Sequence, residues 1–405
     1  MSVPKLRFKR EDGTDYPEWK KQRIGDLFYK VNERNNGQFD KTKWISVAKM
    51  YYQMPDKVTS NNIDTRTYVM RLGDMAFEGH PNSDFLFGRF VVNDIGDGVI
   101  SELFPIYRHK TEYVLKYWKY AIQIEKVMAH IYRRSITSSG ASSNKLNDDD
   151  FQHESICVPC LEEQQKIADF LSTIDEVIAQ SESEVQNLEQ QKKAAMQKIF
   201  SQEVRFKRED GSEYPKWRTT RLYTYLFENK DRNINNDYGK QDVLSVSGEF
   251  GVVNQIEFQG RSFAGADVSL YHILYSGDIV YTKSPLKANP YGIIKYNQGV
   301  TGIVSTLYAV YHCKSNVDGR FIEYYFDDDL ILNKYLKPLV NIGSKHDMKI
   351  NNEYALSGNV CFPCLEEQQK IADFLSAYDE AIRYAKQELD KWKELKKGLL
   401  QQMFV

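Results

Sequence analysis

The residues of this 405-residue chain with the clearest capacity for chemistry are its cysteines, which could bind a metal if they came together. Cys157 and Cys160 form one Cys-x-x-Cys pair, and Cys361 and Cys364 form another. Four thiolates are a common ligand set for structural zinc. The two pairs lie 204 residues apart, however, whereas a ribbon-type zinc site separates its pairs by about 15 to 20 residues. We therefore expect small buried thiols and no metal site.

Other catalytic patterns in the sequence are absent or incomplete. It contains no Walker loop and no Gly-x-Gly-x-x-Gly run after a strand, so no nucleotide cradle is visible. Residues 289–292, Asn-Pro-Tyr-Gly, resemble the Asn-Pro-Pro-Tyr element of adenine methyltransferases but lack its second proline, which favours a turn. Residues 54–57, Met-Pro-Asp-Lys, lack the further carboxylate and lysine of a nuclease motif, and the seven histidines have no metal-ligand spacing. The sequence predicts a chain that performs no catalysis alone.

The chain is an internal duplication. Residues 159–172 recur unchanged as residues 363–376, and residues 8–13, Phe-Lys-Arg-Glu-Asp-Gly, recur as residues 206–211. A repeat of about 200 residues is much longer than the roughly 20 to 50 residues of solenoid repeats, so each copy should have its own core. We predict four segments, namely a globular domain at 1–156, a long helix at 157–203, a second globular domain at 204–360 and a second long helix at 361–405.

The two repeated tails carry a helical pattern. Their apolar residues are spaced by four and three residues in turn over about five heptads, which is a coiled-coil pattern. Each helix should span about 38 residues, or about 57 Å. We expect the two helices to pair with each other within the chain, although the partner could be a different chain, and each helix could instead pack on its own domain. The heptads leave parallel and antiparallel pairing open, and an antiparallel pair would relate the two copies by a pseudo-twofold axis. The predicted seam consists of Ile167, Leu171, Ile174, Ile178, Val185 and Leu188 in the first tail, and of Ile371, Leu375, Tyr378, Ile382, Leu389 and Trp392 in the second.

The charge is nearly balanced along the chain. Its net value is −2, and residues 1–156 carry 24 basic against 21 acidic side chains, whereas residues 204–360 carry 19 against 18. Neither globular domain is therefore strongly basic, so any contact with nucleic acid must be local or shared with partners. The sequence has no apolar run of about 18 residues, and its first residues lack the apolar core of a signal peptide, so we expect a cytoplasmic protein.

The globular domains have a mixed composition of helical and strand segments. Residues 279–282, 292–296 and 306–311 are rich in β-branched and aromatic residues between Gly, Pro and Asn, which predicts strands. Residues 113–122 and 321–326 predict short helices. Gly73 and Asp74 match Gly277 and Asp278 and predict equivalent turns in the two copies. The expected fold class is α+β, with one long helix after each mixed domain.

A polar loop is expected just before each tail, with a second polar segment further upstream. Small hydroxyl and amide side chains flanked by Arg and Lys suit contacts to phosphates and base edges, although ordinary solvated loops remain an alternative. The candidate DNA-binding residues of the first domain are His80, Asn82, Arg89, Arg133, Arg134, Ser139, Ser142, Ser143, Asn144 and Lys145. Those of the second domain are Lys283, Ser284, Lys287, Asn289, Ser344, Lys345 and His346.

The motif Pro-x-Leu-x-Glu-Gln-x-x-Ile-Ala-x-Phe-Leu opens a long helix twice, each time after a divergent domain. In this arrangement the chain resembles the specificity subunits of type I restriction-modification systems over nearly its whole length. The family usually has Pro-Pro where this chain has Pro159-Cys160 and Pro363-Cys364, a change that leaves the helix start intact. The target loops carry no code that can be transferred from the family.

The resemblance implies a non-catalytic subunit in which two long helices form an antiparallel intramolecular coiled coil and separate two target-recognition domains. Each domain would read one half of a split site in double-stranded DNA. It also implies two modification subunits that methylate adenine with S-adenosylmethionine (SAM), and two restriction subunits that use ATP and Mg²⁺. This chain itself would bind no cofactor. Two alternatives remain at this stage, namely a coiled-coil scaffold that binds proteins, and a self-contained methyltransferase that would have to bind S-adenosylmethionine itself.

Overall fold

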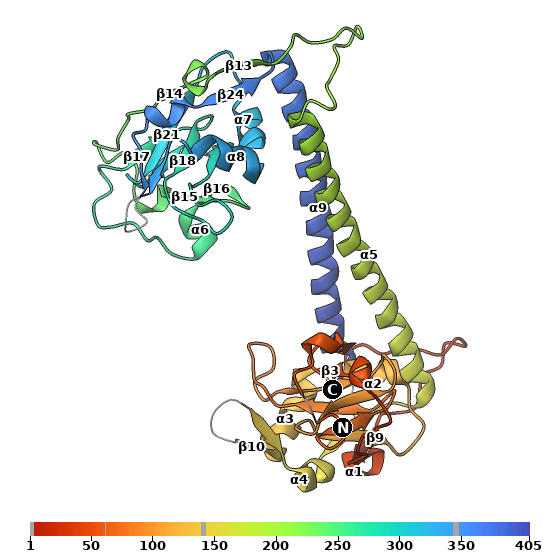
Figure 1. The fold of residues 1–405 in the computed structure, drawn as a ribbon. Coiled ribbons are helices and arrows are strands. Elements are labelled where there is room, and N and C mark those ends of the chain that lie inside the picture. The colour runs from red at the N-terminus through yellow and green to blue at the C-terminus, as the bar shows by residue number, and fades with distance from the viewer. Residues whose placement is uncertain (1–3, 61, 139–142, 343–347) are drawn as a thin grey trace. The chain divides into compact units, whose positions relative to one another are not determined.

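The structure, a computed structural model, describes residues 4–60, 62–138, 143–342 and 348–405 (Figure 1). It divides into two compact units. Unit 1 consists of Met1–Ser183 and Lys386–Val405, and unit 2 of Glu184–Ala385. Each unit therefore contains one globular part, the first half of the helix that follows this part, and the last half of the other long helix. None of the helices in the described part of the chain is long and apolar enough to cross a membrane.

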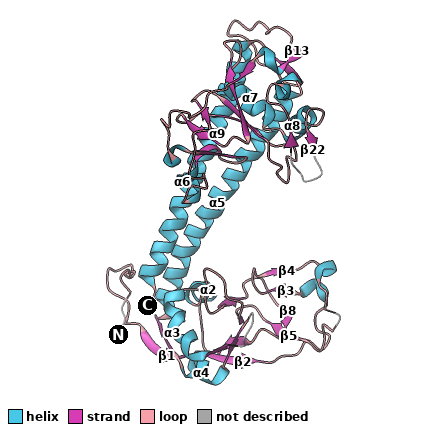
Figure 2. Ribbon diagram, turned by 90° about the vertical axis from the view of Figure 1, so that its left-hand side faces the viewer, coloured by secondary structure: helices cyan, strands magenta, loops and turns pink. Residues whose placement is uncertain are grey.

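The predicted long helices are present as α5 (Leu161–Phe200) and α9 (Leu365–Met403), of 40 and 39 residues. Both begin directly after the Pro-Cys pair of the repeat, and both have two glutamates in the first turn, where the helix dipole favours negative charge. Figures 1 and 2 show the two helices side by side. In unit 1, Lys393 of α9 lies 2.8 Å from Glu182 of α5, and Lys396 lies against Asp175. Residue numbers therefore rise along α9 as they fall along α5, which confirms the antiparallel pair. The pseudo-twofold relation stays a prediction.

The predicted seam positions are buried or half-buried on both helices. Ile167, Leu171, Ile371 and Leu375 are at most 2% exposed, because the first turns of each helix also pack into the core of the preceding globular part. Val185 and Leu389, further along the helices, are 8% and 9% exposed. Packing against the domain and pairing between the helices therefore both occur, at different positions along the same stripe. The remaining seam residues, Ile174, Ile178, Leu188, Tyr378, Ile382 and Trp392, are likewise buried or half-buried.

Unit 1 is built on a four-stranded antiparallel sheet in the order β2-β9-β6-β7, accompanied by the two-stranded pairs β5-β8, β3-β4, β1-β12 and β10-β11. Its helices cover the sheet with an aromatic core. The elements of the unit before α5 are β1 (Lys20–Arg23), α1 (Ile24–Leu27), β2 (Phe28–Val31), β3 (Ile45–Ser46), β4 (Tyr51–Tyr52), β5 (Thr67–Met70), β6 (Met75–Glu78), β7 (Arg89–Val92), β8 (Gly98–Ser101), β9 (Ile106–His109), α2 (Leu115–Ala121), α3 (Glu125–Ser135), β10 (Ile136–Ser138), β11 (Asn144–Leu146), α4 (Asp148–His153) and β12 (Ser155–Val158).

Unit 2 repeats this plan with a sheet in the order β14-β21-β18-β19 and the pairs β17-β20, β15-β16, β13-β24 and β22-β23. Asp328 caps α8 by accepting hydrogen bonds from two backbone N–H groups of the first turn. The elements between the two long helices are β13 (Arg218–Arg221), β14 (Leu226–Glu228), β15 (Leu244–Ser247), β16 (Gly251–Asn254), α6 (Gln255–Gln259), β17 (His272–Leu274), β18 (Ile279–Thr282), β19 (Ile294–Tyr296), β20 (Gly302–Val304), β21 (Tyr308–Cys313), α7 (Gly319–Phe326), α8 (Asp329–Leu336), β22 (Asn341–Ile342), β23 (Met348–Lys349) and β24 (Asn359–Phe362).

The local predictions held for most of these elements. The strand predicted at 279–282 is β18, and the two predicted short helices are α2 and α7. The expectation of a loop at 133–145 was wrong at both ends, because residues 133–135 end helix α3 and residues 136–138 and 144–146 form the hairpin β10-β11. The corresponding segment of unit 2 likewise contains the strands β22 and β23. Paired strands thus flank both predicted segments, and residues 139–142 and 343–347 between them lie outside the described part of the chain.

The repeated motif docks each long helix onto the globular part. In unit 1, Arg7 donates two hydrogen bonds to Glu163, at 2.9 and 2.8 Å. In unit 2, Arg205 binds Glu367 in the same way, at 3.1 and 2.6 Å. Both glutamates are fully buried, and a bidentate arginine pair satisfies a buried carboxylate well. The Glu-Glu-Gln-Gln run is therefore conserved between the copies as a docking site for the arginine that precedes each Phe-Lys-Arg-Glu-Asp-Gly head.

Candidate nucleic-acid interface

Two of the predicted polar segments of unit 1 come together beside the central sheet. The connection between β6 and β7, residues 79–88, lies against the hairpin β10-β11, where Asn144 N–H donates to the Gly79 carbonyl oxygen at 2.8 Å. A Cβ atom added at Gly79 would lie 2.0 Å from the Asn144 carbonyl oxygen, so only glycine permits this close approach. The contact places the His80 and Asn82 loop next to the hairpin that carries Lys145.

The candidate residues of unit 1 fall into exposed residues and anchors. His80, Arg134 and Lys145 are exposed, and Arg134 lies 3.6 Å from Glu154 with 73% of its side chain accessible. Arg133 is also exposed, at the end of α3. Arg89, in contrast, donates to the Ala48 carbonyl oxygen at 2.5 Å and to Glu78 at 3.3 Å. Its charge is therefore used mainly to hold the β3-β4 hairpin against the sheet.

The remaining candidates of unit 1 are partly structural. Asn82 is exposed, and its side-chain oxygen accepts hydrogen bonds from the backbone N–H groups of Asp84 and Phe85, which shapes the loop. Ser143 and Asn144 are half-buried beside Gly79. Ser139 and Ser142 lie outside the described residues. The exposed cations at this end of unit 1 are suited to phosphate contacts, because Lys and Arg neutralise the DNA backbone.

Unit 2 has the equivalent connection between β18 and β19, residues 283–293. Its Asn289 donates to Asp329 of α8 at 2.8 Å, and Asn333 of α8 donates back to the Asn289 oxygen at 3.2 Å. Gly292, with φ of +91°, closes the loop where an added Cβ would lie 1.9 Å from the Thr282 carbonyl oxygen. Two amide contacts thus fasten the loop to α8, and Gly292 permits the close approach of the loop to β18.

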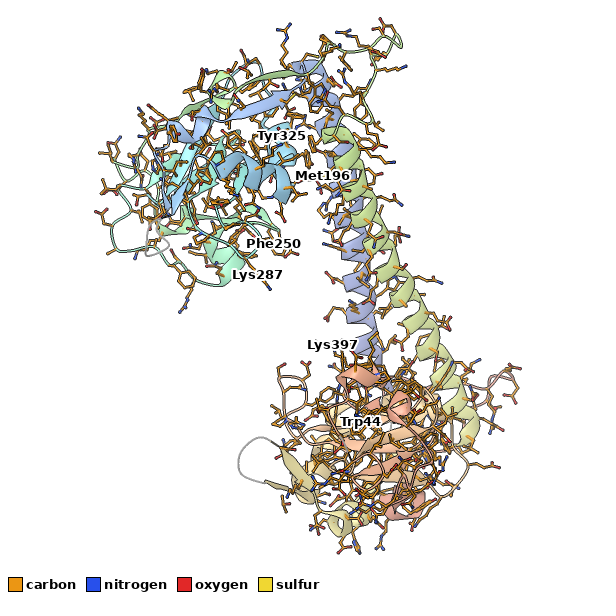
Figure 3. The ribbon with its side chains drawn as sticks, in the orientation of Figure 1. Trp44, Met196, Phe250, Lys287, Tyr325 and Lys397 are labelled. Carbon is orange, nitrogen blue, oxygen red and sulfur yellow. The ribbon has the colours of Figure 1, made fainter. Side chains whose placement is uncertain are left out.

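Among the candidates of unit 2, only Lys287 is exposed within the described residues of that set (Figure 3). Lys283 is half-buried and donates to the Asn352 oxygen at 2.9 Å. Burial lowers the pKa of the Lys283 ammonium group. Ser284 is half-buried. Ser344, Lys345 and His346 lie outside the described residues. The structure therefore separates one solvent-facing cation from two residues, Lys283 and Asn289, that anchor the loop.

A shared frame of buried polar residues lies at the turns that precede β6 and β18, at the opposite ends of these strands from the two loops. Asp74 accepts a hydrogen bond from Arg71 N–H at 2.7 Å, and Asp278 accepts one from Tyr275 N–H at 3.1 Å. The preceding glycines, Gly73 and Gly277, have φ of +87° and +96°, which explains the Gly-Asp pair seen in both copies. The equivalent turns predicted from the sequence are therefore present in both units.

The same frame carries different partners in the two units. In unit 1, Arg108 binds both oxygens of Asp74, at 2.7 and 2.8 Å. In unit 2, the ring of His312 lies 2.6 Å from Asp278 instead. Burial raises the pKa of both aspartates, and the hydrogen bond from Arg108 or His312 opposes that effect. The same backbone frame thus holds different side chains in the two units, Arg108 of β9 and His312 of β21.

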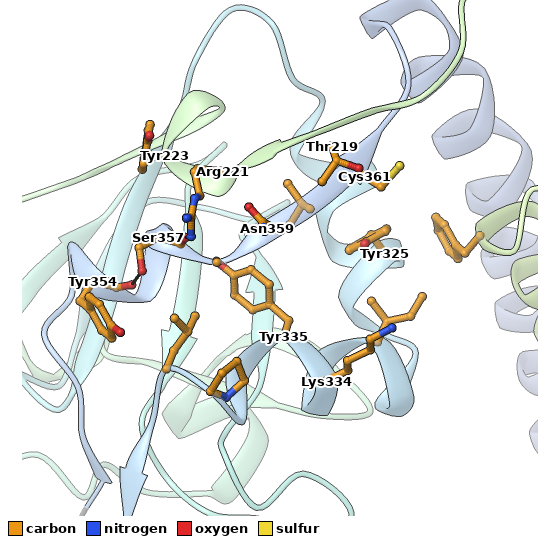
Figure 4. A pocket seen from close by; sticks show the side chains of 16 residues that line it. Thr219, Arg221, Tyr223, Tyr325, Lys334, Tyr335, Tyr354, Ser357, Asn359 and Cys361 are labelled. Carbon is orange, nitrogen blue, oxygen red and sulfur yellow. Dashed lines mark hydrogen bonds between the residues drawn. The ribbon is translucent and has the colours of Figure 1, made fainter.

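Unit 2 also contains a groove of about 1050 Å³ that the sequence did not reveal (Figure 4). Its wall includes the exposed rings of Tyr223 and Tyr354 and the cations Arg221 and Lys334. Tyr223 follows β13 at the position that Gly25 occupies after β1 in unit 1, where an added Cβ would lie only 3.0 Å from the Gln152 carbonyl oxygen. In unit 1, α1 and α4 thus approach each other closely at this position, where a side chain as large as tyrosine would not fit without a shift of α4.

Two further observations concern residues that the sequence analysis missed or left aside. Phe250, at the tip of the β15-β16 hairpin, is 57% exposed and lies 5.2 Å from the ring of Phe258 of α6. Such exposed aromatic residues could have been suspected only after the hairpin was known. The cysteines are free and half-buried, and no group of three or more metal-ligating side chains occurs within the part of the chain that the structure describes.

Comparison with known proteins identifies the family. Residues 16–190 match the model of the type I restriction modification DNA specificity domain. The chain is 25% identical to the putative type I restriction enzyme MjaX specificity subunit of Methanocaldococcus jannaschii, over 368 residues that cover 83% of this chain and 79% of that protein. It is 24% identical to the MjaVIII specificity subunit of the same organism, over 62% of this chain and 61% of that protein.

Solved structures have the same fold. The type I restriction-modification S subunit from M. genitalium aligns over 100% of this chain and 99% of its own, with a TM-score of 0.55 and 13% identity. A chain from a study of complex assembly and conformational transition in the type I restriction-modification system aligns over 96% of this chain and 98% of its own, with a TM-score of 0.53 and 15% identity. These matches confirm the resemblance found in the motifs: residues 16–190 match the DNA specificity domain of type I restriction-modification systems, and the chain is similar over most of its length to the specificity subunits of these systems, a family that recognises DNA sequence and is not itself catalytic.

Proposed function

We propose that each globular part, residues 1–156 and residues 204–360, reads one half of a bipartite DNA site. The observation that carries this proposal is the backbone frame that both units share with different side chains. Asp74 and Asp278 occupy equivalent turns, but Asp74 binds Arg108 and Asp278 binds His312. A duplicated fold with different loops suits two DNA-recognition domains that have similar structures and different sequence specificities. The loops at 79–88 and 283–293, together with the adjacent hairpins, are the surfaces we assign to DNA.

Within these surfaces, we assign phosphate contacts to the exposed cations and leave the anchors to shape the loops. The cations would be Arg133, Arg134 and Lys145 in unit 1 and Lys287 in unit 2, and the exposed side chain of His80 would lie beside those of unit 1 as a further contact. Arg89, Lys283 and Asn289 act indirectly, because their polar groups hold neighbouring parts of the protein. Few exposed cations lie on these surfaces within the described residues, so the subunit alone should bind DNA weakly and gain affinity when partners add phosphate contacts.

The chemistry belongs to partner subunits in this proposal. Two modification subunits would bind S-adenosylmethionine and methylate adenine in the site that this chain selects. Two restriction subunits would use ATP and Mg²⁺ for translocation and cleavage. The support for this division is the match to the specificity domain and to specificity subunits, together with the incomplete catalytic motifs of the sequence.

Single-molecule sequencing of adenine methylation tests the proposal in cells that express this chain with its modification subunit. The expected result is a bipartite methylated motif that is absent from cells lacking this chain. Exchange of residues 1–156 for the corresponding domain of a relative should then change one half of the motif and leave the other half intact. A change of both halves would refute independent readers, and the absence of any motif with an active partner would favour a protein-binding scaffold.

A further inference from the structure

The apolar stripe of each long helix is interrupted by a lysine, Lys192 in α5 and Lys396 in α9. Both lysines are mostly covered, with 16% and 26% of their side chains accessible. An apolar residue at such a position would stabilise the helix pair more simply, because a covered charge loses hydration. A single polar residue in a coiled-coil seam can instead fix the register of the helices at some expense of stability.

In unit 1, three helices meet at Asp175 of α5. Tyr120 of α2 donates a hydrogen bond from its hydroxyl to one carboxylate oxygen at 2.6 Å, and Lys396 of α9 binds the other oxygen. The Lys396 ammonium also lies 5.4 Å from the centre of the Tyr120 ring, within the range of a cation–π contact. One carboxylate therefore connects the globular part, the helix that follows it, and the last half of the other long helix.

In unit 2, the same cluster occurs with the helices exchanged. Tyr324 of α7 donates to Asp379 of α9 at 2.6 Å, and Lys192 of α5 donates to the other oxygen of Asp379 at 2.6 Å. Lys192 also lies 5.0 Å from the centre of the Tyr324 ring. The separation between the aspartate and the lysine is 17 residues on each helix, from Asp175 to Lys192 and from Asp379 to Lys396. The two clusters are thus equivalent in composition, contacts and spacing.

The donor in each cluster is well defined. Burial raises the pKa of the Tyr120 and Tyr324 hydroxyls, and the hydrogen bond to the aspartate raises it further. Each hydroxyl therefore stays protonated at physiological pH and donates, while the aspartate accepts from both the tyrosine and the lysine. Because each oxygen of the aspartate has its own donor, a shift of any one helix along its axis breaks at least one bond.

We infer that Tyr120–Asp175–Lys396 and Tyr324–Asp379–Lys192 are positioning residues that fix each globular part on the antiparallel helix pair and thereby set the number of base pairs between the two half-sites. This inference rests on the proposed function, since it concerns the spacing of the bipartite motif. DNA rises about 3.4 Å per base pair, so a small axial slip of a reader on the helix pair is comparable with a change of one base pair in the spacer.

The test replaces both lysines by methionine, Lys192→Met with Lys396→Met, in the chain assembled with its modification subunit. Adenine methylation is measured on DNA substrates whose spacer equals the native spacer, or is one base pair shorter or longer. The preference for the native spacer is expected to fall about tenfold, equivalent to about 1.4 kcal/mol. The melting temperature should change little, because methionine suits an apolar seam. The conservative pair Lys192→Arg with Lys396→Arg should retain most of the preference.

The matched control is Lys393→Met, which removes another interhelical ion pair of unit 1. Lys393 and Glu182 lie 2.8 Å apart, but both are 47% exposed, and no tyrosine among the described residues of the globular part donates a hydrogen bond to Glu182. This control is expected to leave the spacer preference unchanged. If the Lys→Met pair fails to fold, Tyr120→Phe with Tyr324→Phe provides the second test, since it removes only two hydroxyls and should also weaken the spacer preference.

The outcomes separate the inference from the proposed function. If the unaltered chain, assembled with its modification subunit, directs methylation to no bipartite motif, the proposed function itself is refuted. If the unaltered chain yields a motif, and both the lysine and the tyrosine variants keep its spacer preference, the clusters are only stabilising and the inference is overturned. Loss of the preference in the Lys393→Met control as well would also overturn it, because any loosening of the helix pair would then have the same effect.

Discussion

The backbone N–H of Leu6 donates a hydrogen bond to the carbonyl oxygen of Gln402, at 3.1 Å, and so fastens the start of the chain to the last turn of α9 within unit 1. In unit 2, Val204 N–H makes the same bond to the Lys198 carbonyl oxygen, at 3.1 Å, where the chain is continuous. Phe404 packs on Tyr117 with ring centroids 5.7 Å apart, as Phe200 packs on Phe321 at 6.0 Å. In unit 1, non-covalent contacts thus hold the end of α9 beside residue Leu6 in the way that the continuous chain holds the end of α5 beside Val204 in unit 2.

The first prediction is that the chain tolerates circular permutation at this junction. Five residues separate Lys198 from Val204, and joining Val405 directly to Pro4 would leave five between Gln402 and Leu6. Pro4 would then stand where Gln202 has φ of +61°, which proline cannot adopt, so the fusion needs Pro4→Gly. A permutant of this kind, opened between Gln202 and Glu203, should fold and keep the same methylated motif. Circular dichroism and methylation sequencing check this outcome.

The control for this permutant uses the same fusion but opens the chain between Ser183 and Glu184, in the middle of α5. A break there interrupts the continuous helix, so this version should lose much of its helix signal and its activity. Normal helix signal and activity in both permutants would show that the helix need not be continuous. Loss of folding or activity in the Gln202–Glu203 permutant would contradict the equivalence of the two junctions.

The second prediction concerns the buried carboxylate that docks α5. Glu163→Gln removes the charge that Arg7 and the indole N–H of Trp19 bind, the latter at 3.2 Å. The free energy of unfolding of unit 1 should fall by about 2 kcal/mol, the usual range for losing hydrogen bonds to a charged group. Urea unfolding followed by tryptophan fluorescence measures this change. The matched control is Glu162→Gln, because Glu162 is largely exposed beside Arg10 and should contribute less than about 0.5 kcal/mol.

The third prediction is a loss of stability of unit 2 in mild acid. His272 is 2% exposed on β17, and burial, reinforced by the charges of Arg232 and Lys283, lowers its pKa to about 4. Between pH 6.5 and about 4 the unfolded chain therefore binds a proton that the folded chain does not, so stability falls as the pH falls through this range. The slope should approach 1.4 kcal/mol per pH unit, roughly the value for one proton. His272→Leu should flatten this part of the profile.

The control is His130→Leu, which replaces an exposed histidine of α3 in unit 1 and leaves His272 in place, so the loss of stability of unit 2 in acid should persist. The measurement is the melting temperature of each variant between pH 7.5 and pH 4.5. An acid slope that persists unchanged in the His272→Leu variant would assign the effect to other groups.

The parts of the fold that the sequence revealed are those set by local repetition. The 3.5-residue spacing located α5 and α9, and the β-branched run Ile279–Thr282 located β18, because these patterns reflect burial of one face. Helix α3 was missed because its last turn contains Arg133 and Arg134, whose charges suggested a loop. Its buried face is formed by Val127, Met128 and Ile131, which pack into the unit 1 core.

The roles of single cations could not be predicted, because their partners are distant in sequence. Arg89 appeared to be a free loop cation, but its guanidinium contacts Ala48, which is 41 residues away. Lys283 similarly contacts Asn352, which is 69 residues away. Composition indicates that a segment is polar, whereas only the tertiary fold decides whether a given charge faces solvent or another strand.

The fourth prediction uses this distinction between exposed and anchoring cations. Lys287→Ala should weaken DNA binding by the assembled complex equally for all sequences, and should reduce the slope of log K against log salt concentration by about 1, as expected for one lost phosphate contact. Lys283→Ala should instead lower the stability of unit 2, since its ammonium holds Asn352 of the same unit.

The control for Lys287→Ala is Lys397→Ala, on the exposed face of α9, where the salt slope should not change. Fluorescence anisotropy at several salt concentrations, with specific and unrelated duplexes, distinguishes these outcomes. If Lys287→Ala leaves the slope unchanged while Lys397→Ala lowers it, the DNA lies along the helix pair, and the assignment of the 283–293 loop to the DNA is wrong.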